Sequence, residues 1–167
     1  MLQLRPLRLT DEAAFRSALE VMARERFTFG FGLEPGMDWG TYLKTLEDKR
    51  RGINVPDGWV PDTFLVADIA GTIVGRTSIR HELNESLKRG GGHIGYCVLP
   101  EYRRRGHATE ILRQSLIVAR ASGIGQVLIT CDDDNTGSIA VIERCGGKLD
   151  SVIRGAPSGP LIRRYLI

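Results

Sequence analysis

The sequence VLPEYRRRGHATEIL, residues 98–112, decides the fold, because it joins a strand to a helix through a turn that contains a glycine. Pro100 ends the apolar strand, and the helical spacing of apolar residues begins after Gly106. The first turn of a helix leaves backbone N–H groups without partners, and these groups carry partial positive charge. Gly106 has no Cβ, so a phosphate can approach its backbone closely. The stretch therefore predicts a diphosphate-binding turn. A plain helix start beside a solvated basic cluster is the alternative.

Two better-known phosphate-binding motifs are absent from the sequence. There is no GxxxxGK[ST] loop and no GxGxxG turn followed by an acidic residue. The turn is therefore neither a Walker A loop nor a dinucleotide fingerprint.

The segments on both sides of this turn read as apolar strands and amphipathic helices. We expect strands at residues 2–9, 63–69, 72–83, 93–100, 126–132, 148–155 and 160–167, and helices at 10–24, 38–51, 106–122 and 136–145. The strand–helix–strand unit over residues 93–132 is a crossover, which is typical of parallel or mixed sheets. The pattern predicts one α/β domain over residues 1–167, with a mixed, twisted central sheet of about seven strands and helices on both faces.

Composition narrows the classes of function. The chain has 167 residues, 42% of them hydrophobic, which suits a globular domain with its own core. Its net charge is +3 and only three basic residues cluster, without interleaved aromatic residues, so we expect no nucleic-acid partner. The three cysteines form no CxxC pair and no HExxH occurs, so we expect no metal site. No run approaches transmembrane length, and we expect a cytoplasmic protein without a membrane partner.

Two motifs in the chain resemble those of the GCN5-related N-acetyltransferases. RRRGHA, residues 103–108, is similar to that family's [QR]xxGx[GA] signature, and NTGSIAVIERCGG, residues 135–147, is similar to its second marker. The strings IRHELNE, GGHIGY and LITCDDDN also look like an uncharacterised bacterial branch of the family. The resemblance covers residues 63–154 well, and it implies the acyl-CoA N-acyltransferase fold.

The resemblance implies acetyl-coenzyme A (acetyl-CoA) as the co-substrate and assigns residues to it. In the family, Arg103 would lead the signature, and main-chain N–H groups of the turn would hold the diphosphate. These groups map to Arg104, Arg105, Gly106, His107, Ala108 and Thr109. The pantetheine arm would bond to the main chain near Cys97 and Val98, and the Val98 N–H would polarise the thioester carbonyl. Asn135 and Ser138 would face the cofactor, although Asn135 also suits a helix cap.

The resemblance also implies a reaction and an acceptor class. The acetyl group would move to a primary amine of a small molecule or peptide by direct attack in a ternary complex. The amine must lose a proton first, and Glu82 and His81 are the favoured general bases, with Glu85, His93 and Asp132 as other candidates. The family habit of pairing C-terminal strands leaves a homodimer open.

One position departs from the family pattern. Family members often carry a tyrosine four residues before the glycine pair, where it protonates the leaving thiolate, and this chain has Ile142 there. Ser138 or a water would then serve as the acid, or no acid is needed because a coenzyme A thiolate leaves readily near neutral pH. The departure also keeps a non-catalytic CoA-binding sensor module as an alternative.

Overall fold

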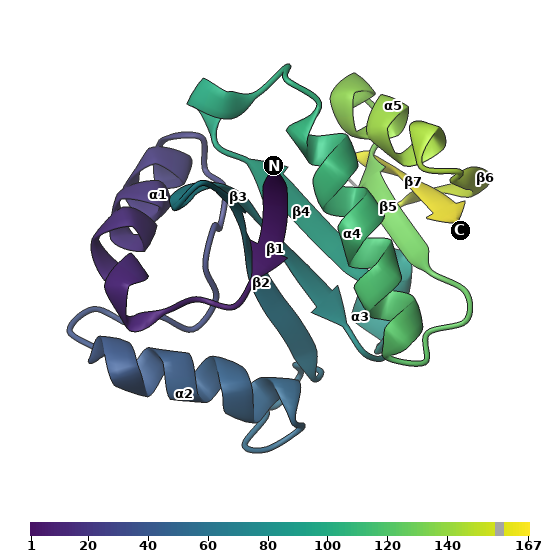
Figure 1. Cartoon of the computed structure of the whole chain (residues 1–167). Helices are drawn as coiled ribbons and strands as arrows, with labels where there is room; N and C mark the ends of the chain where they lie inside the picture. Colours follow the sequence, from purple (N-terminus) through teal and green to yellow (C-terminus); the bar gives the residue numbers. More distant parts are fainter. Residues whose placement is uncertain (156–158) are drawn as a thin grey trace.

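The computed structural model describes residues 1–155 and 159–167, and it contains seven strands and five α-helices in that part of the chain (Figure 1). The strands are β1 Leu2–Arg5, β2 Asp62–Ile69, β3 Thr72–Arg80, β4 Ile94–Val98, β5 Leu128–Asp132, β6 Lys148–Arg154 and β7 Leu161–Leu166. The helices are α1 Glu12–Arg24, α2 Trp39–Arg50, α3 Glu85–Arg89, α4 His107–Ala121 and α5 Thr136–Arg144. This is the mixed α/β fold class that the sequence predicts.

The first four strands form one antiparallel sheet in chain order. A two-residue turn at Ala70 and Gly71, both with positive φ, closes the β2–β3 hairpin. Alternate residues of β2 pack on opposite faces, as expected for a strand buried on both sides. Phe64 and Val66 lie in a cluster with α1 and α2, whereas Leu65 and Ala67 lie in clusters with α4. Helices therefore cover both faces of this sheet.

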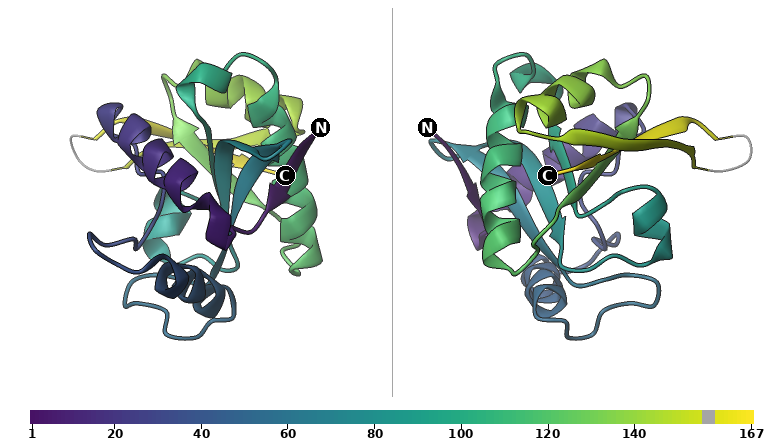
Figure 2. Two further views of the ribbon diagram at one scale, coloured as in Figure 1. Left: turned by 60° about the vertical axis from the view of Figure 1, so that its left-hand side comes forward. Right: turned by 90° about the vertical axis from the view of Figure 1, so that its right-hand side faces the viewer.

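The last three strands form a second antiparallel sheet in the order β5-β7-β6. Figure 2 shows β6 and β7 extending away from the other elements. The crossover that the sequence predicts over residues 93–132 is present, but β4 and β5 form no parallel ladder. A bond from the His93 N–H to the Leu128 carbonyl, 2.7 Å long, joins the two strands only where they start. Every strand ladder in the described part of the chain is consequently antiparallel, and the central sheet is divided between β4 and β5.

Several elements are shorter than the sequence predicts. β1 ends at Arg5, whose guanidinium is engaged by Asp11 and Asp68 at 2.6 and 2.8 Å. α1 begins at Glu12 because a 3₁₀ turn occupies Leu9–Asp11. β3 ends at Arg80, so His81 and Glu82 lie beyond the strand. Within residues 1–155 and 159–167, every helix is too short or too polar to span a bilayer.

Candidate functional site

The turn before α4 presents unpaired backbone amides. A 3₁₀ turn at Pro100–Tyr102 follows β4, Arg104 and Gly106 then adopt positive φ values of 62° and 81°, and α4 starts at His107. No side chain caps this helix start. The first helical bond runs from the Glu110 N–H to the Gly106 carbonyl. The N–H groups of residues 107–109 therefore have no partner within the helix and point away from its start.

A cavity of about 440 Å³, the first cavity, lies between this turn and α5. Its walls come from the end of β4, the turn, the start of α4 and the length of α5: Val98, Tyr102, Arg103, Arg104, Gly106, His107, Ala108, Thr109, Thr136, Gly137, Ala140, Val141 and Arg144. A Cβ on Gly106 would meet no atom within 4 Å, so the space before this glycine is open. Arg105 does not line the cavity, and its guanidinium lies 5.9 Å from the centre of the Tyr102 ring.

A second cavity, of about 410 Å³, adjoins the first, because Val98, Arg103, Ala108, Gly137 and Val141 line both. It adds side chains from the end of α1 and the residues just after it, from β4 and from the start of α5: Met22, Glu25, Phe27, Tyr96, Cys97, Asn135 and Ser138. We call the two cavities together the groove. The groove leads from the start of α4, along the edge of β4 that faces β5, to the end of α1.

The main chain of β4 faces the groove at every second residue, where the Val98 carbonyl accepts from Arg103. The ladder with β3 is bounded by bonds from the Arg80 N–H to the His93 carbonyl and from the Leu99 N–H to the Val74 carbonyl. Pairing alternates along an antiparallel ladder, so Cys97 bonds to β3 whereas the main chains of Tyr96 and Val98 face β5. Of the two β4 residues that the sequence names, Val98 therefore turns its N–H toward the groove, and Cys97 turns its main chain toward β3.

Arg103 fixes the turn against α1 and β4. Its Nε donates to the Val98 carbonyl at 3.0 Å, and its Nη2 forms an ion pair with Glu25 at 2.5 Å. The hydrogen bond from Arg103 lowers the pKa of the Glu25 carboxyl. The Arg103 side chain is therefore engaged within the protein and holds the groove walls together.

Tyr96 is a groove residue that the sequence analysis missed. Its hydroxyl lies 2.9 Å from the Ser138 Oγ and links β4 to α5. Burial raises the pKa of the Tyr96 phenol to about 12, although the Ser138 bond lowers it. The string GGHIGY ends in this tyrosine but gives it no role, because its contact with Ser138 depends on β4 and α5 meeting in space. Asn135 caps α5 through its Oδ1, which accepts from the Ser138 N–H at 3.0 Å, and it also lines the groove.

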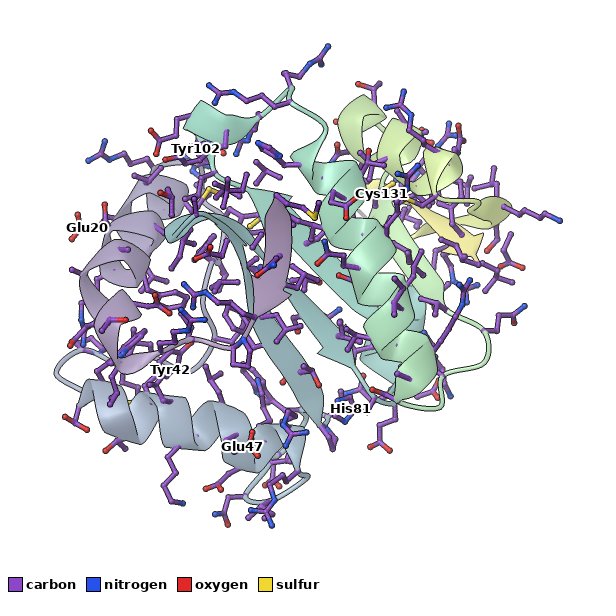
Figure 3. All side chains as sticks on the ribbon, in the orientation of Figure 1. Glu20, Tyr42, Glu47, His81, Tyr102 and Cys131 are labelled. Carbon is purple, nitrogen blue, oxygen red and sulfur yellow. The ribbon has the colours of Figure 1, made fainter. Side chains whose placement is uncertain are left out.

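Glu82 and His81 lie away from the groove. β3 and β4 are antiparallel, so the end of β3 lies beside the start of β4, whereas Val98 pairs with Gly75. Five residues of strand separate Gly75 from Arg80, or about 17 Å. The His81 Nε2 contacts the Thr63 Oγ1 at 2.8 Å, and burial lowers the pKa of the imidazole. Figure 3 shows His81 and Tyr102 at opposite ends of the sheet.

Ile142 faces the core. It is fully buried in the cluster that joins α4, β5 and β7. A tyrosine at this position of this chain would therefore not reach the groove, where α5 presents Gly137, Ser138 and Val141. In the described part of the chain, no three His, Cys, Asp or Glu side chains form a group that could hold a metal ion.

Comparisons with known proteins agree on one family. The model of the acetyltransferase (GNAT) domain matches residues 1–148. RimJ of Mycobacterium smegmatis, solved in complex with CoA-disulfide, is 22% identical with a TM-score of 0.71, over 99% of this chain and 81% of that one. YncA of Salmonella typhimurium, described as a putative acetyltransferase with its cofactor acetyl-CoA, is 16% identical with a TM-score of 0.67, over 99% and 92%.

The ribosomal L7/L12 α-N-protein acetyltransferase RimL, in complex with coenzyme A, is 18% identical with a TM-score of 0.67, over 99% of this chain and 93% of that one. These structural similarities establish the fold. No curated protein matches the sequence.

Proposed function

The chain belongs to the GNAT acetyltransferase family, and on that premise we propose that it binds acetyl-CoA in the groove and transfers the acetyl group to an amine. The observation that carries the proposal is the uncapped start of α4, whose free amides open onto a groove along the unpaired edge of β4. Family members of similar fold have been solved with coenzyme A or acetyl-CoA, which supports the same co-substrate here.

The diphosphate of acetyl-CoA fits the start of α4. The N–H groups of residues 104–109 would donate to its oxygens, and Arg104 would add positive charge beside them. Gly106 leaves the approach open, because nothing within 4 Å occupies the position of a side chain there. Thr109 also lines the cavity, where its hydroxyl can donate to a phosphate oxygen. Arg105 would contribute charge only at longer range.

The edge of β4 would position the acyl end of the co-substrate. The main chain of Tyr96 and the N–H of Val98 face the groove and can bond to the co-substrate as a neighbouring strand would. The Val98 N–H would then donate to the thioester oxygen as negative charge develops on it. Asn135 and Ser138 close the opposite wall.

The Tyr96 hydroxyl would protonate the leaving thiolate. It lines the groove, and a pKa of about 12 keeps it protonated throughout the neutral range. This assignment removes the difficulty raised by Ile142, because the acid comes from β4 instead of α5. The acceptor amine attacks directly in a ternary complex after losing a proton. Glu82 or His81 can take that proton only through a chain of waters, because neither lines the groove.

The proposal retains a single domain over residues 1–167, a cytoplasmic location and an amine acceptor that is a small molecule or a peptide. It is tested by calorimetry with acetyl-CoA, followed by release of free coenzyme A thiol with a panel of amines. We expect micromolar or tighter binding and thiol release that depends on the amine. Binding without such release would identify a sensor module instead, and no binding would reject the site.

A further inference from the structure

A third cavity, of about 250 Å³, lies on the face of the first sheet that α1 and α2 cover. Its walls combine apolar and charged side chains, among them Phe31, Trp59, Leu87, Lys49, Asp62 and Arg80. Trp59 is 46% exposed, which is unusual for a tryptophan and leaves its ring accessible beside the cavity. This cavity has no part in the binding of acetyl-CoA proposed above.

Two of its charges neutralise each other. Asp62 and Lys49 are 4% and 7% exposed, and the Lys49 Nζ lies 2.7 Å from the Asp62 Oδ1. The Ser78 hydroxyl donates to the other carboxylate oxygen at 2.5 Å. Each oxygen of Asp62 thus contacts one neighbour, and the charge of this carboxylate also acts on Arg76 and Arg80 without direct contact.

Arg80 has no such partner. Its Nη1 donates to the carbonyls of Gly91 and Gly92, both at 3.0 Å, and no ion pair of Arg80 occurs among the residues that the structure describes. Burial lowers the pKa of Arg80, and the charge of Arg76 lowers it further while Asp62 opposes the change. A cation that is withdrawn from water without a carboxylate in direct contact is unfavourable.

Arg76 adds a second positive charge beside it. Arg76 is 3% exposed and donates to the main-chain carbonyls of Thr28, Phe29 and Gly95. A Cβ on Gly95 would lie 3.5 Å from the Arg80 Nη2 and 3.7 Å from the Arg76 Nη1. Two guanidinium groups therefore flank one glycine, and neither forms an ion pair among the described residues.

The position of the two arginines connects this cavity with the groove. The Arg76 guanidinium lies 5.1 Å from the Phe27 ring, which lines the groove, and 5.0 Å from the Phe31 ring, which lines the third cavity. Gly95 precedes Val98 on β4 by three residues, a distance of about 10 Å. An anion held at Arg80 would be within the length of a small molecule from the thioester.

We propose that the third cavity is the acceptor subsite and that Arg80 binds a carboxylate of the acceptor. The substrate class is then a small amine that also carries a carboxylate and an apolar or aromatic group, as an amino acid does. The carboxylate supplies a counter-ion in direct contact with Arg80, and Phe31, Trp59 and Leu87 contact the apolar group. This inference rests on the proposed acetyl transfer.

The test compares matched acceptors with the wild-type protein. L-phenylalanine, L-phenylalaninamide and phenethylamine share an amine and a ring but differ in the carboxylate. We expect kcat/KM for L-phenylalanine to exceed that for each of the other two by about 10- to 100-fold, the range of a charge-assisted hydrogen bond. The phosphonate analogue of phenylalanine tests a phosphate-like anion, and a C-terminally amidated peptide that begins with phenylalanine tests a protein N-terminus.

Variants of Arg80 assign the preference to this residue. Arg80→Gln should raise the KM for L-phenylalanine about 10-fold or more, leave phenethylamine unchanged and preserve acetyl-CoA affinity. Arg80→Lys, which keeps the charge, should restore part of the preference. Arg89→Gln, an exposed arginine on α3, is the matched control and should change nothing. If Arg80→Gln fails to fold, the comparison of acceptors with the wild-type protein and the Arg80→Lys variant still test whether Arg80 binds the carboxylate.

The outcomes separate this inference from the proposed function. Failure to bind acetyl-CoA would reject both. Binding of acetyl-CoA with equal transfer to phenethylamine and L-phenylalanine would reject only the subsite, as would a clear preference for the phosphonate or for the peptide. If none of these amines is acetylated, calorimetry with the CoA-bound protein compares the affinities of L-phenylalanine and its amide and so tests the subsite. Tighter binding of the amino acid supports the subsite, and equal binding contradicts it.

Discussion

The groove and the third cavity differ in the groups that they offer to the ligands proposed for them. The groove relies on main-chain groups, namely the N–H groups at the start of α4 and the free edge of β4. The third cavity relies on side-chain charges from α2, β2 and β3, namely Lys49, Asp62 and Arg80. The first arrangement needs a backbone conformation, whereas the second needs particular side chains to be buried together.

This difference determines what a substitution does. A change in the groove that preserves the backbone should affect ligand binding and leave folding intact. A change among the charges of the third cavity alters a buried electrostatic balance, so it should affect stability first. The two regions can therefore be separated by measuring stability and coenzyme A affinity on the same variants.

The largest effect is expected from Asp62→Asn. This change leaves the Lys49 ammonium buried without its partner, and removing one member of a buried pair typically costs about 3–5 kcal/mol. Denaturant unfolding should show that loss. Asp48→Asn on α2, which breaks the pair with the exposed Lys44, is the control and should cost less than about 1 kcal/mol. Similar losses for both variants would contradict the contrast between the two regions.

Gly106→Glu should act on binding instead. The new carboxylate would occupy the position proposed for the diphosphate, and we expect calorimetry to show about 100-fold weaker affinity for coenzyme A, or about 2.7 kcal/mol. Gly106→Ala imposes the same φ of 81° without the charge, and a Cβ there meets no atom. The alanine variant should carry only the cost of the left-handed conformation, about 1–2 kcal/mol of stability. Full affinity in the glutamate variant would place the diphosphate elsewhere.

Tyr96→Phe should slow catalysis without weakening the binding of acetyl-CoA. We expect kcat to fall about 10-fold, less than for many general acids, because a thiolate leaves readily. Tyr102→Phe, a phenol on the wall of the first cavity, is the control and should keep full kcat. Equal rates for wild type and Tyr96→Phe in pre-steady-state measurements would remove Tyr96 from the mechanism.

The same variant tests the pKa of Tyr96. Burial raises this pKa to about 12, above the ordinary value near 10, so the folded state holds the proton more tightly than the unfolded state. The stability that Tyr96 contributes is thus complete below pH 10 and is lost as the pH rises toward 12. Between pH 10 and pH 12, the melting temperature of the wild type should fall more steeply with rising pH than that of Tyr96→Phe. Parallel curves would contradict the raised pKa.

The smallest effect is expected from Glu25→Gln. The ion pair with Arg103 is 42% exposed on each side, so its loss should be weak, and solvent screens it. We expect coenzyme A affinity to fall by less than about fivefold, because Arg103 keeps its bond to the Val98 carbonyl. Glu47→Gln, which breaks a comparable pair on α2, should leave affinity unchanged. A larger loss for Glu25→Gln would show that this pair shapes the groove.

The sequence predicts the groove better than the third cavity, because the groove depends on backbone conformation and the third cavity depends on side chains from distant segments. A positive φ calls for glycine and a helix start needs only local sequence, so Gly106 and the residues after it are visible in one short stretch. The fold class was also predicted correctly from strand and helix periodicity. The separation of β4 from β5 was not, because the spacing of apolar residues does not reveal which neighbouring strands stop pairing.

Side-chain sites assembled from distant segments were harder to predict. Tyr96 meets Ser138 across 42 positions of sequence, and Arg80 meets Gly95 and Arg76 only through the register of β3 and β4. The sequence favours His81 and Glu82 because it places them at the end of a strand whose following loop can border the acceptor cleft, but β3 ends at the far side of the sheet from Val98. Nothing in local sequence distinguishes the two ends of an antiparallel strand.

Backbone NMR of the ¹⁵N-labelled protein tests most directly whether the start of α4 holds the diphosphate. The amide resonances of Gly106, His107, Ala108 and Thr109 are followed while coenzyme A is added, and then with pantetheine, which lacks the diphosphate. We expect these resonances to shift with coenzyme A and to stay in place with pantetheine, whereas Val98 responds to both. If coenzyme A shifts Val98 but leaves residues 106–109 unmoved, the diphosphate does not bind at the start of α4.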